Sequence, residues 1–258
     1  MRILFIGDIV GQPGRKMVAR HVPRLVAVHG VDAVIANAEN AAAGFGITPN
    51  VARELFDTGV ALLTSGNHVW DKKEAEAYLA TEGRVLRPAN YPDEVPGSGK
   101  SILRVGERLV GVVNLQGRAF LPPIDCPFRA ADRELAELQR VTDIVLMDFH
   151  AEATAEKQAF GWYVDGRVSA VLGTHTHVQT ADERILPGRT AYITDVGMTG
   201  PRDSVIGMRP EDAIPKFLTQ MPRRFTVADG PAQLNAVLVD IEDGGRASAI
   251  QRLQIVDD

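Results

Sequence analysis

Acids, amides and histidines recur along this sequence directly after short apolar runs. The positions are Asp8, Asn37, Glu39, Asn40, Asn67, His68, Asp148, His150, His175 and His177. Carboxylate and amide oxygens, together with imidazole nitrogens, are donors that bind divalent first-row metals. A pair of such metals can activate a bridging hydroxide and hold the phosphoryl oxygens of an in-line displacement. The pattern therefore predicts a two-metal hydrolase that cleaves phosphate esters.

The segment Gly173-Thr174-His175-Thr176-His177 carries the sharpest single signal. In an extended backbone, residues two apart point to the same side, so both imidazoles are expected to face one site. The alternative is a pair of surface histidines in a loop. The histidines at positions 68 and 150 also follow apolar runs, and this grouping favours the metal site.

Asn67 and His68 have separate expected roles, although Ser65-Gly66-Asn67 is also good composition for a simple turn. Asn67 offers a neutral carbonyl oxygen as a ligand. His68 is adjacent and points elsewhere, which frees it to protonate a leaving alkoxide, since the pKa of an unperturbed histidine is about 6.5. Two metals need a bridging carboxylate, and Glu39 is the candidate. No protein nucleophile is required, and no Gly-x-Ser-x-Gly motif is present.

Alternating strand and helix patterns must position these residues. Strands are predicted at 3–6, 33–36, 60–63, 144–147, 168–172, 191–194, 234–241 and 249–256, with a hairpin formed by 102–105 and 109–113. Helices are predicted at 15–28, from 48 to 59, and at 72–79 and 129–140. Pro23 should kink or shorten the first helix. Ligands in open α/β sheets bind beyond the carboxyl ends of the strands, so the polar set should meet at one edge. A mixed sheet, or two sheets packed between helices, fits this pattern.

Length and composition describe an ordinary globular protein. The chain has 258 residues, 45% of them hydrophobic and 24% charged, and is expected to form one domain over 1–258. Its net charge of −5, without a basic stripe, argues against duplex nucleic acid as a partner. A single cysteine, Cys126, allows no intrachain disulfide, and neither a signal peptide nor a membrane span is recognisable. We therefore expect a soluble cytoplasmic protein.

Two glycine-rich segments mimic nucleotide-binding loops. Gly97-Ser98-Gly99-Lys100-Ser101 resembles the end of a P-loop, but the pattern requires glycine at position 94, which is Glu94. The segment Gly7-Asp8-Ile9-Val10-Gly11 has the wrong glycine spacing for a dinucleotide loop, and its acid would repel a pyrophosphate. Neither a nucleoside triphosphatase nor a dinucleotide enzyme is expected.

Longer motifs carry a resemblance to a known family. Asp8, Glu39-Asn40, Gly66-Asn67-His68, His150 and Gly173-Thr174-His175-Thr176-His177 occur in the order of the calcineurin-like metallophosphoesterases. One branch, the YmdB-like phosphodiesterases, is resembled more closely and nearly end to end. The motifs that carry this closer resemblance are Gly7-Asp8-Ile9-Val10-Gly11, Asn37-Ala38-Glu39-Asn40, Asp148-Phe149-His150-Ala151-Glu152-Ala153-Thr154 and Asp195-Val196-Gly197-Met198-Thr199-Gly200-Pro201.

The resemblance implies a four-layer α/β/β/α metallophosphoesterase sandwich with two mixed sheets. It also implies a dinuclear centre of iron, for which manganese can substitute. Asp8, Glu39, Asn40 and His177 would hold one metal, and Glu39, Asn67, His150 and His175 the other. His68 would be the proton donor. The activity implied is hydrolysis of 2′,3′- and 3′,5′-cyclic nucleotides, so the expected partner is a small phosphate ester.

The sequence departs from the broad superfamily at the first metal. The usual Asp-x-His is here Asp8-Ile9-Val10, and the usual bridging aspartate is Glu39. We expect the side-chain oxygen of Asn40 to replace the lost imidazole. This exchange makes the first site richer in oxygen and leaves the identity of its metal open.

Two other functions compete with the diesterase. One is a metal-dependent phosphomonoesterase, and the other is a non-catalytic regulator that binds a cyclic nucleotide. A structural zinc site is closed by four ligands and is usually rich in cysteine, whereas the candidate ligands here include none. Loop residues that could shape substrate choice are Asn90, Gln116, Arg118, Phe120, Thr199 and Arg202. The apolar segment Phe120-Leu121-Pro122 could form a homo-oligomer interface.

Overall fold

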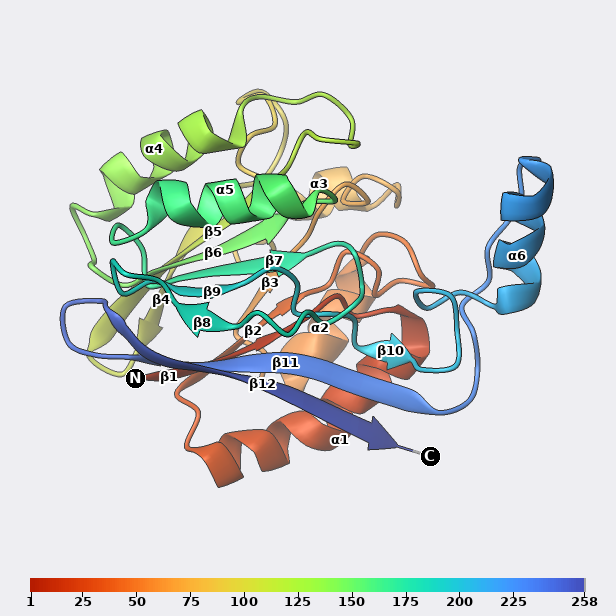
Figure 1. The fold of residues 1–258 in the computed structure, drawn as a ribbon, viewed down its shortest axis with the longest axis horizontal. Helices are drawn as coiled ribbons and strands as arrows, with labels where there is room; N and C mark the ends of the chain where they lie inside the picture. The colour runs from red at the N-terminus through yellow and green to blue at the C-terminus, as the bar shows by residue number, and fades with distance from the viewer. Residues whose placement is uncertain (258) are drawn as a thin grey trace.

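The computed structural model describes residues 1–257 and has two β-sheets at its centre, with helices outside them (Figure 1). In the first sheet three parallel strands lie side by side: β1 (Arg2–Ile6), β2 (Ala33–Asn37) and β3 (Leu62–Thr64). The strands that extend it beyond β1 run antiparallel to their neighbours: β10 (Gly200–Pro201), β11 (Ala232–Ile241) and β12 (Ala247–Asp257). The sheet is therefore mixed, as predicted.

The second sheet has the order β4-β5-β6-β7-β9-β8. Its four central strands are parallel: β5 (Arg108–Gln116), β6 (Val145–His150), β7 (Ala170–Thr174) and β9 (Ala191–Ile193). The two edge strands pair in the antiparallel sense: β4 (Lys100–Val105) and β8 (Arg184–Ile185). The predicted hairpin is the β4–β5 pair.

Helices cover the outer face of each sheet. Those on the first sheet are α1 (Gly11–His29), α2 (Pro49–Asp57) and α3 (Ala75–Leu79). Those on the second are α4 (Pro127–Leu138) and α5 (Thr154–Val164). One more helix, α6 (Pro210–Thr219), stands away from the rest of the molecule in Figure 1. The layers are α/β/β/α, which confirms the fold expected from the resemblance.

The core between the two sheets follows from alternation along the strands. In β1, Ile3 and Phe5 belong to the cluster that faces the second sheet, whereas Leu4 and Ile6 pack under the helices. All four are fully buried. Successive side chains of a strand point to opposite faces, so a strand buried on both faces is apolar throughout. Polar residues are therefore expected mainly near the ends of such strands.

The bounds of α1 and α2 show where the local sequence decides the extent of a helix and where tertiary packing does. Thr48 caps α2 as predicted, its hydroxyl accepting a hydrogen bond from the backbone N–H of Val51. The prediction that Pro23 shortens the first helix is wrong, because α1 continues to His29 and ends at Gly30 in the left-handed conformation. Val18, Val22 and Leu25 bury the same helix against the first sheet, and this packing outweighs the lost hydrogen bond at proline.

Within residues 1–257, no helix has both the length and the apolar character needed to cross a membrane.

A helical glycine controls how closely α5 approaches the second sheet. A Cβ at Gly161 would lie 2.6 Å from the buried ring of Tyr192. Alanine normally stabilises a helix interior over glycine by up to about 1 kcal/mol. Here we expect Gly161→Ala to lower the free energy of unfolding by about 1–3 kcal/mol, because the ring has no room to move. Urea denaturation measures the change.

The matched control removes the ring. In a Tyr192→Leu background, Gly161→Ala should be neutral or slightly stabilising, since the clash is gone and only the helix preference remains. A Gly161→Ala variant more stable than the wild-type chain would contradict the close packing of α5.

Candidate metal centre

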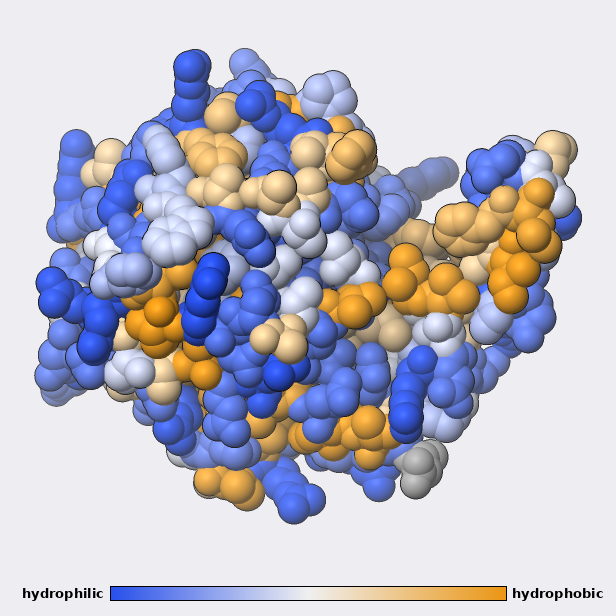
Figure 2. All heavy atoms as spheres, in the orientation of Figure 1, coloured by the Kyte–Doolittle hydropathy of each residue, from blue (hydrophilic) through white to orange (hydrophobic). Residues whose placement is uncertain are grey.

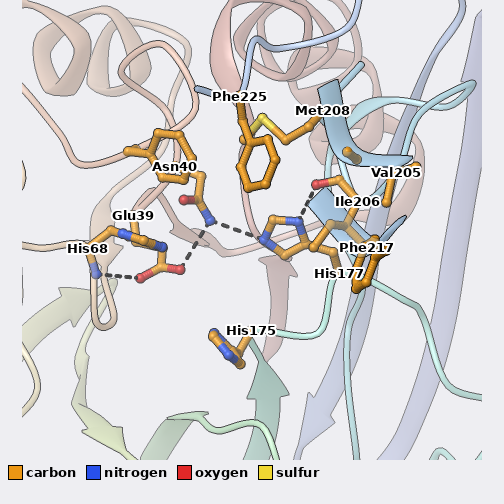
Figure 3. Close-up of a pocket in the computed structure, with 12 residues that line it drawn as sticks. Glu39, Asn40, His68, His175, His177, Val205, Ile206, Met208, Phe217 and Phe225 are labelled. Atoms are coloured by element: carbon orange, nitrogen blue, oxygen red, sulfur yellow. Dashed lines mark hydrogen bonds between the residues drawn. The ribbon is translucent and has the colours of Figure 1, made fainter. Parts of the chain in front are cut away.

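The carboxyl ends of strands from both sheets converge on one site. Asp8 follows β1, Glu39 and Asn40 follow β2, Asn67 follows β3, His150 ends β6, and His175 and His177 follow β7. Figure 3 shows several of these side chains around a common space. Every residue that the sequence nominated as a ligand therefore lies at this edge, which is where parallel α/β sheets place their ligands.

Two groups of ligand atoms overlap at Glu39. One consists of Glu39, His150 and His175, the other of Asp8, Glu39 and His177, and within each group the atoms lie within 4.8 Å of one another. Asp8 and His150 are fully buried, and Glu39 is 1% exposed. A carboxylate shared by two clusters has the position that a bridging ligand requires.

The first cluster centres on the Nε2 atom of His150. This nitrogen lies 3.0 Å from Glu39 Oε1 and 3.2 Å from Asn67 Oδ1. It also lies 3.0 Å from the Nδ1 atom of His175. The side-chain oxygen of Asn67 therefore points into the same space as the two imidazoles, as predicted for a ligand.

The second cluster contains a difference from expectation at Asn40. Its amide nitrogen donates to Glu39 Oε1 at 3.1 Å and lies 3.1 Å from His177 Nε2 (Figure 3). His177 Nε2 lies 3.9 Å from Asp8 Oδ1. The sequence predicted that the amide oxygen of Asn40 faces a metal. That arrangement requires the amide to be turned over, a choice that the surrounding hydrogen bonds decide.

Each imidazole is held from outside the centre by its other nitrogen. His150 Nδ1 lies 2.9 Å from the Thr174 hydroxyl, and His177 Nδ1 donates to the backbone carbonyl of Ile206 at 2.9 Å. His175 Nε2 lies 3.1 Å from the carboxylate of Glu152. Such partners fix the ring and its tautomer, so that the inner nitrogen presents a lone pair. Ile206 was not singled out from the sequence, and Thr174 and Glu152 appeared only within longer motifs.

The backbone of the two-histidine segment is not extended, so that prediction is wrong. His175 has φ of 101° and His177 has φ of 66°, both in the left-handed region that residues with a Cβ rarely occupy. The two imidazoles consequently enter different clusters rather than lying side by side. The backbone N–H of His175 donates to Asp8 Oδ2 at 3.2 Å, which ties this turn to the end of β1.

A buried carboxylate beneath the centre joins the two sheets. Asp148, on β6, accepts hydrogen bonds from the hydroxyls of Thr64 and Thr174 and from the amide of Asn37. Asn37 and Thr64 end strands of the first sheet, and Thr174 ends β7 of the second. Burial raises the pKa of Asp148 to about 6, against the opposing effect of His150. The sequence had placed Asn37 and Asp148 at strand ends without a role.

An ion pair holds the same turn from the other side. Lys157, on α5, is 1% exposed, and its ammonium donates to Asp195 Oδ2 at 2.6 Å and to the carbonyl of Thr174 at 2.7 Å. Asp195 also accepts from the backbone N–H groups of Thr176 and Gly197. Buried charges require such pairing, and this one fixes the backbone between the two histidines.

The charges of the centre match a cation. Burial would raise the pKa of Glu39, but His150 outweighs it and lowers that pKa. Burial would lower the pKa of His150, but the carboxylates of Glu39 and Asp8 raise it. Burial, aided by His150, lowers the pKa of His175 to about 3. Among the described residues, the buried Asp8 Oδ1 has no hydrogen-bond partner. Inward lone pairs and unpartnered carboxylate oxygen are what divalent cations bind.

His68 lies at the rim of this centre rather than among the ligands. Its Nδ1 lies 2.9 Å from Asp71 Oδ2, and its backbone N–H donates to Glu39 Oε2 at 3.2 Å. Its ring meets that of Phe45 edge to face at 5.0 Å. The contact with Asp71 leaves Nε2 as the nitrogen that can exchange a proton with a bound molecule.

A cavity of about 200 Å³ opens beside the centre. Its lining combines residues of the centre with apolar side chains: Glu39, Asn40, Phe45, His68, His175, His177, Val205, Ile206, Met208, Ala213, Phe217 and Phe225. None of the loop residues nominated for substrate choice belongs to it. Asn90, for example, is buried and donates to the carbonyls of Gln116 and Asp125. The apolar lining comes mainly from residues 205–225, for which the sequence offered no signal.

Gly66 lets the backbone pass directly against the two clusters. A Cβ there would lie 2.3 Å from Glu39 Oε2 and 2.3 Å from His150 Nε2. We expect Gly66→Ala to separate the shared carboxylate from the imidazole and to weaken Mn²⁺ binding by roughly 10- to 100-fold or more. Calorimetric titration of the metal-stripped protein measures the affinity.

Gly83 supplies the matched control. It is exposed, and a Cβ there would meet nothing within 4 Å. Gly83→Ala should therefore bind Mn²⁺ as the wild-type chain does. Unaltered binding by the Gly66→Ala variant would show that the cation binds elsewhere.

Comparison with known proteins places this geometry in a family. The family described as YmdB-like protein matches residues 4–253. The 2′,3′-cyclic-nucleotide 2′-phosphodiesterase of Bacillus subtilis (strain 168) is 52% identical over 259 residues, covering 100% of this chain and 98% of the relative.

Two solved structures share the whole fold. A hypothetical protein from Thermus thermophilus superposes with a TM-score of 0.95 at 46% identity, covering 100% of both chains. A structure described as a novel phosphatase from Mycoplasma pneumoniae superposes with a TM-score of 0.94 at 34% identity, covering 100% of this chain and 94% of the other. By sequence and by structure, this chain belongs to the YmdB-like protein family.

Proposed function

We propose that this protein is a phosphodiesterase with a dinuclear metal centre that hydrolyses cyclic nucleotides, with a 2′,3′- or a 3′,5′-cyclic phosphate. The observation that carries the proposal is the pair of buried ligand clusters that share Glu39. The Bacillus subtilis relative, named a 2′,3′-cyclic-nucleotide 2′-phosphodiesterase, supports the substrate class.

In this proposal the two clusters divide the ligands as the resemblance implies. Asp8, Glu39, Asn40 and His177 would hold one cation, and Glu39, Asn67, His150 and His175 would hold the other. The cations supply positive charge that activates water and neutralises the phosphoryl oxygens. Iron, with manganese as a substitute, agrees with a donor set of imidazole, carboxylate and amide that contains no thiolate.

The protein's own residues then position and protonate the substrate. The outer partners of the three imidazoles hold their inner nitrogens toward the space that the cations would occupy. His68, oriented by Asp71, gives a proton to the leaving ribose oxygen. The apolar side chains of the cavity limit the access of bulk water to the reacting phosphate.

The test is hydrolysis by metal-stripped enzyme reloaded with Mn²⁺ or Fe²⁺. The substrates are bis-p-nitrophenyl phosphate, 2′,3′-cyclic AMP and 3′,5′-cyclic AMP. We expect metal-dependent cleavage that Glu39→Gln abolishes, because this variant keeps the size of the side chain and removes the shared charge. Cyclic nucleotides should be cleaved with release of the nucleoside monophosphate.

The relative rates of the two cyclic substrates rank the diester specificity. Binding of metal without turnover of any diester would sink the diesterase proposal. Turnover of nucleotide monoesters would then indicate a phosphomonoesterase, and tight binding of cyclic nucleotide without turnover would indicate a regulator.

A separate prediction concerns His68 as the proton donor. His68→Ala should lower turnover of a cyclic nucleotide by roughly 10²–10⁴-fold, because the leaving alkoxide needs a proton. Turnover of bis-p-nitrophenyl phosphate should fall far less, since nitrophenolate leaves without one. Initial rates on both substrates measure the split.

Asp71→Asn is the companion variant, because it keeps a side chain of similar size beside His68 and removes the charge that orients the ring. It should show the same split in weaker form. An equal loss on both substrates would assign His68 to the support of the metal centre instead.

A further inference from the structure

Residues 205–228, here called the arm, form a projection that carries α6 beside the metal centre (Figure 1). Short bridges pair Val205 with Met208 and Met208 with Val227 at its base. The backbone N–H of Arg209 also donates to the carbonyl of Thr226. The two sides of the arm are thus tied together at its base, while α6 lies beyond the tie.

The base of the arm packs on the turns that carry the ligands. Gly11 and Gly44 have φ of 57° and 96° and follow Asp8 and Asn40 in the chain. A Cβ at Gly11 would lie 3.0 Å from Val227, and a Cβ at Gly44 would lie 2.8 Å from Val227 and 3.0 Å from Met208. The arm is therefore seated directly against the metal centre.

One side of the cavity is an apolar wall, to which the arm contributes most residues and Phe45 the rest. The other side is the centre itself. Figure 3 shows Glu39 and His68 at one side of the view and Val205, Ile206 and Phe217 at the other. Three phenyl rings, those of Phe45, Phe217 and Phe225, line the cavity together with Met208. Phe217 is 73% exposed, and Figure 2 shows apolar side chains along the projection. The ring of Phe217 is therefore open to a bound molecule.

The size of the cavity fits one aromatic group. A cavity of roughly 150 Å³ lined by apolar side chains is enough for a benzene ring, and this one measures about 200 Å³. Aromatic side chains are the usual stacking partners of nucleobases, and stacking tolerates any base because every base has a π-face. The polar side chains of the lining all belong to the centre or to His68. The wall itself offers no side-chain group that could read the edge of a base.

We propose that the wall formed by Phe45, Met208, Phe217 and Phe225 binds the nucleobase of the substrate while its phosphate occupies the metal centre. This inference rests on the proposed function, since it assigns part of the same substrate. Its consequence is a preference for cyclic nucleotides over base-free cyclic phosphates, with weak discrimination among the four bases.

The test compares two substrates of the metal-loaded enzyme. One is 2′,3′-cyclic AMP, and the other is 1-O-methyl-ribofuranose 2′,3′-cyclic phosphate, which has no base. We expect Phe217→Ala to lower the ratio of their kcat/KM values by between about 5- and 150-fold, the range that a lost base stack produces. Leu218→Ala is the matched control, because Leu218 is 78% exposed on the same helix and does not line the cavity. That variant should keep the wild-type ratio.

The outcomes separate this inference from the proposed function. An unchanged ratio in Phe217→Ala, or an equal loss on both substrates, would overturn the nucleobase site while leaving the diesterase intact. If the wild-type enzyme cleaves neither substrate, nor 3′,5′-cyclic AMP, the proposed function fails, and calorimetry with adenosine tests the wall alone. Weaker adenosine binding by Phe217→Ala than by Leu218→Ala would then support the wall as a base site, and equal binding would overturn it.

Discussion

The carboxylate of Asp148 is the interaction on which the rest of the structure depends. An ionised group buried between the two sheets is costly unless hydrogen bonds surround it. Asp148 obtains them from Asn37 and Thr64 in one sheet and from Thr174 in the other. These donors sit at strand ends, so the two sheets must stop at the same level. The metal centre lies directly beyond these strand ends.

The ligand side chains of the centre are held in place by the Asp148 network and by hydrogen-bond partners that lie outside the centre. Thr174 contacts both Asp148 and His150, so the imidazole is oriented by the same network that joins the sheets. The pair of Lys157 and Asp195 holds the left-handed turn that sends His175 and His177 into separate clusters. Because of this preorganisation, a cation would meet donors already in place, and folding rather than binding would supply the free energy needed to bring like charges together.

Much of this arrangement could be predicted from the sequence. Buried parallel strands appear in the sequence as apolar runs, and every nominated ligand follows such a run, because a polar side chain buried within the run is costly. The conformation of His175 and His177 could not be predicted, since the backbone N–H groups of His175 and Thr176 donate to Asp8 and Asp195, which lie outside this segment of the chain. Helix α1 passes through Pro23 for a similar reason, because packing of one face outweighs a local preference. The apolar wall beside the centre left no periodic signal, because the arm is not part of a layer.

The hydrogen bond from His177 to the carbonyl of Ile206 joins the arm to the chemistry. Ile206 itself has φ of 48°, a conformation that a β-branched residue adopts only under constraint. The backbone that presents the apolar wall is thus the same backbone that fixes a donor of the centre. A redesign of the arm for a different substrate must therefore leave the backbone at Ile206 unchanged. Side chains on α6 can be replaced, whereas an insertion before Ile206 or a change at Met208 or Val227 would disturb the metal centre at the same time.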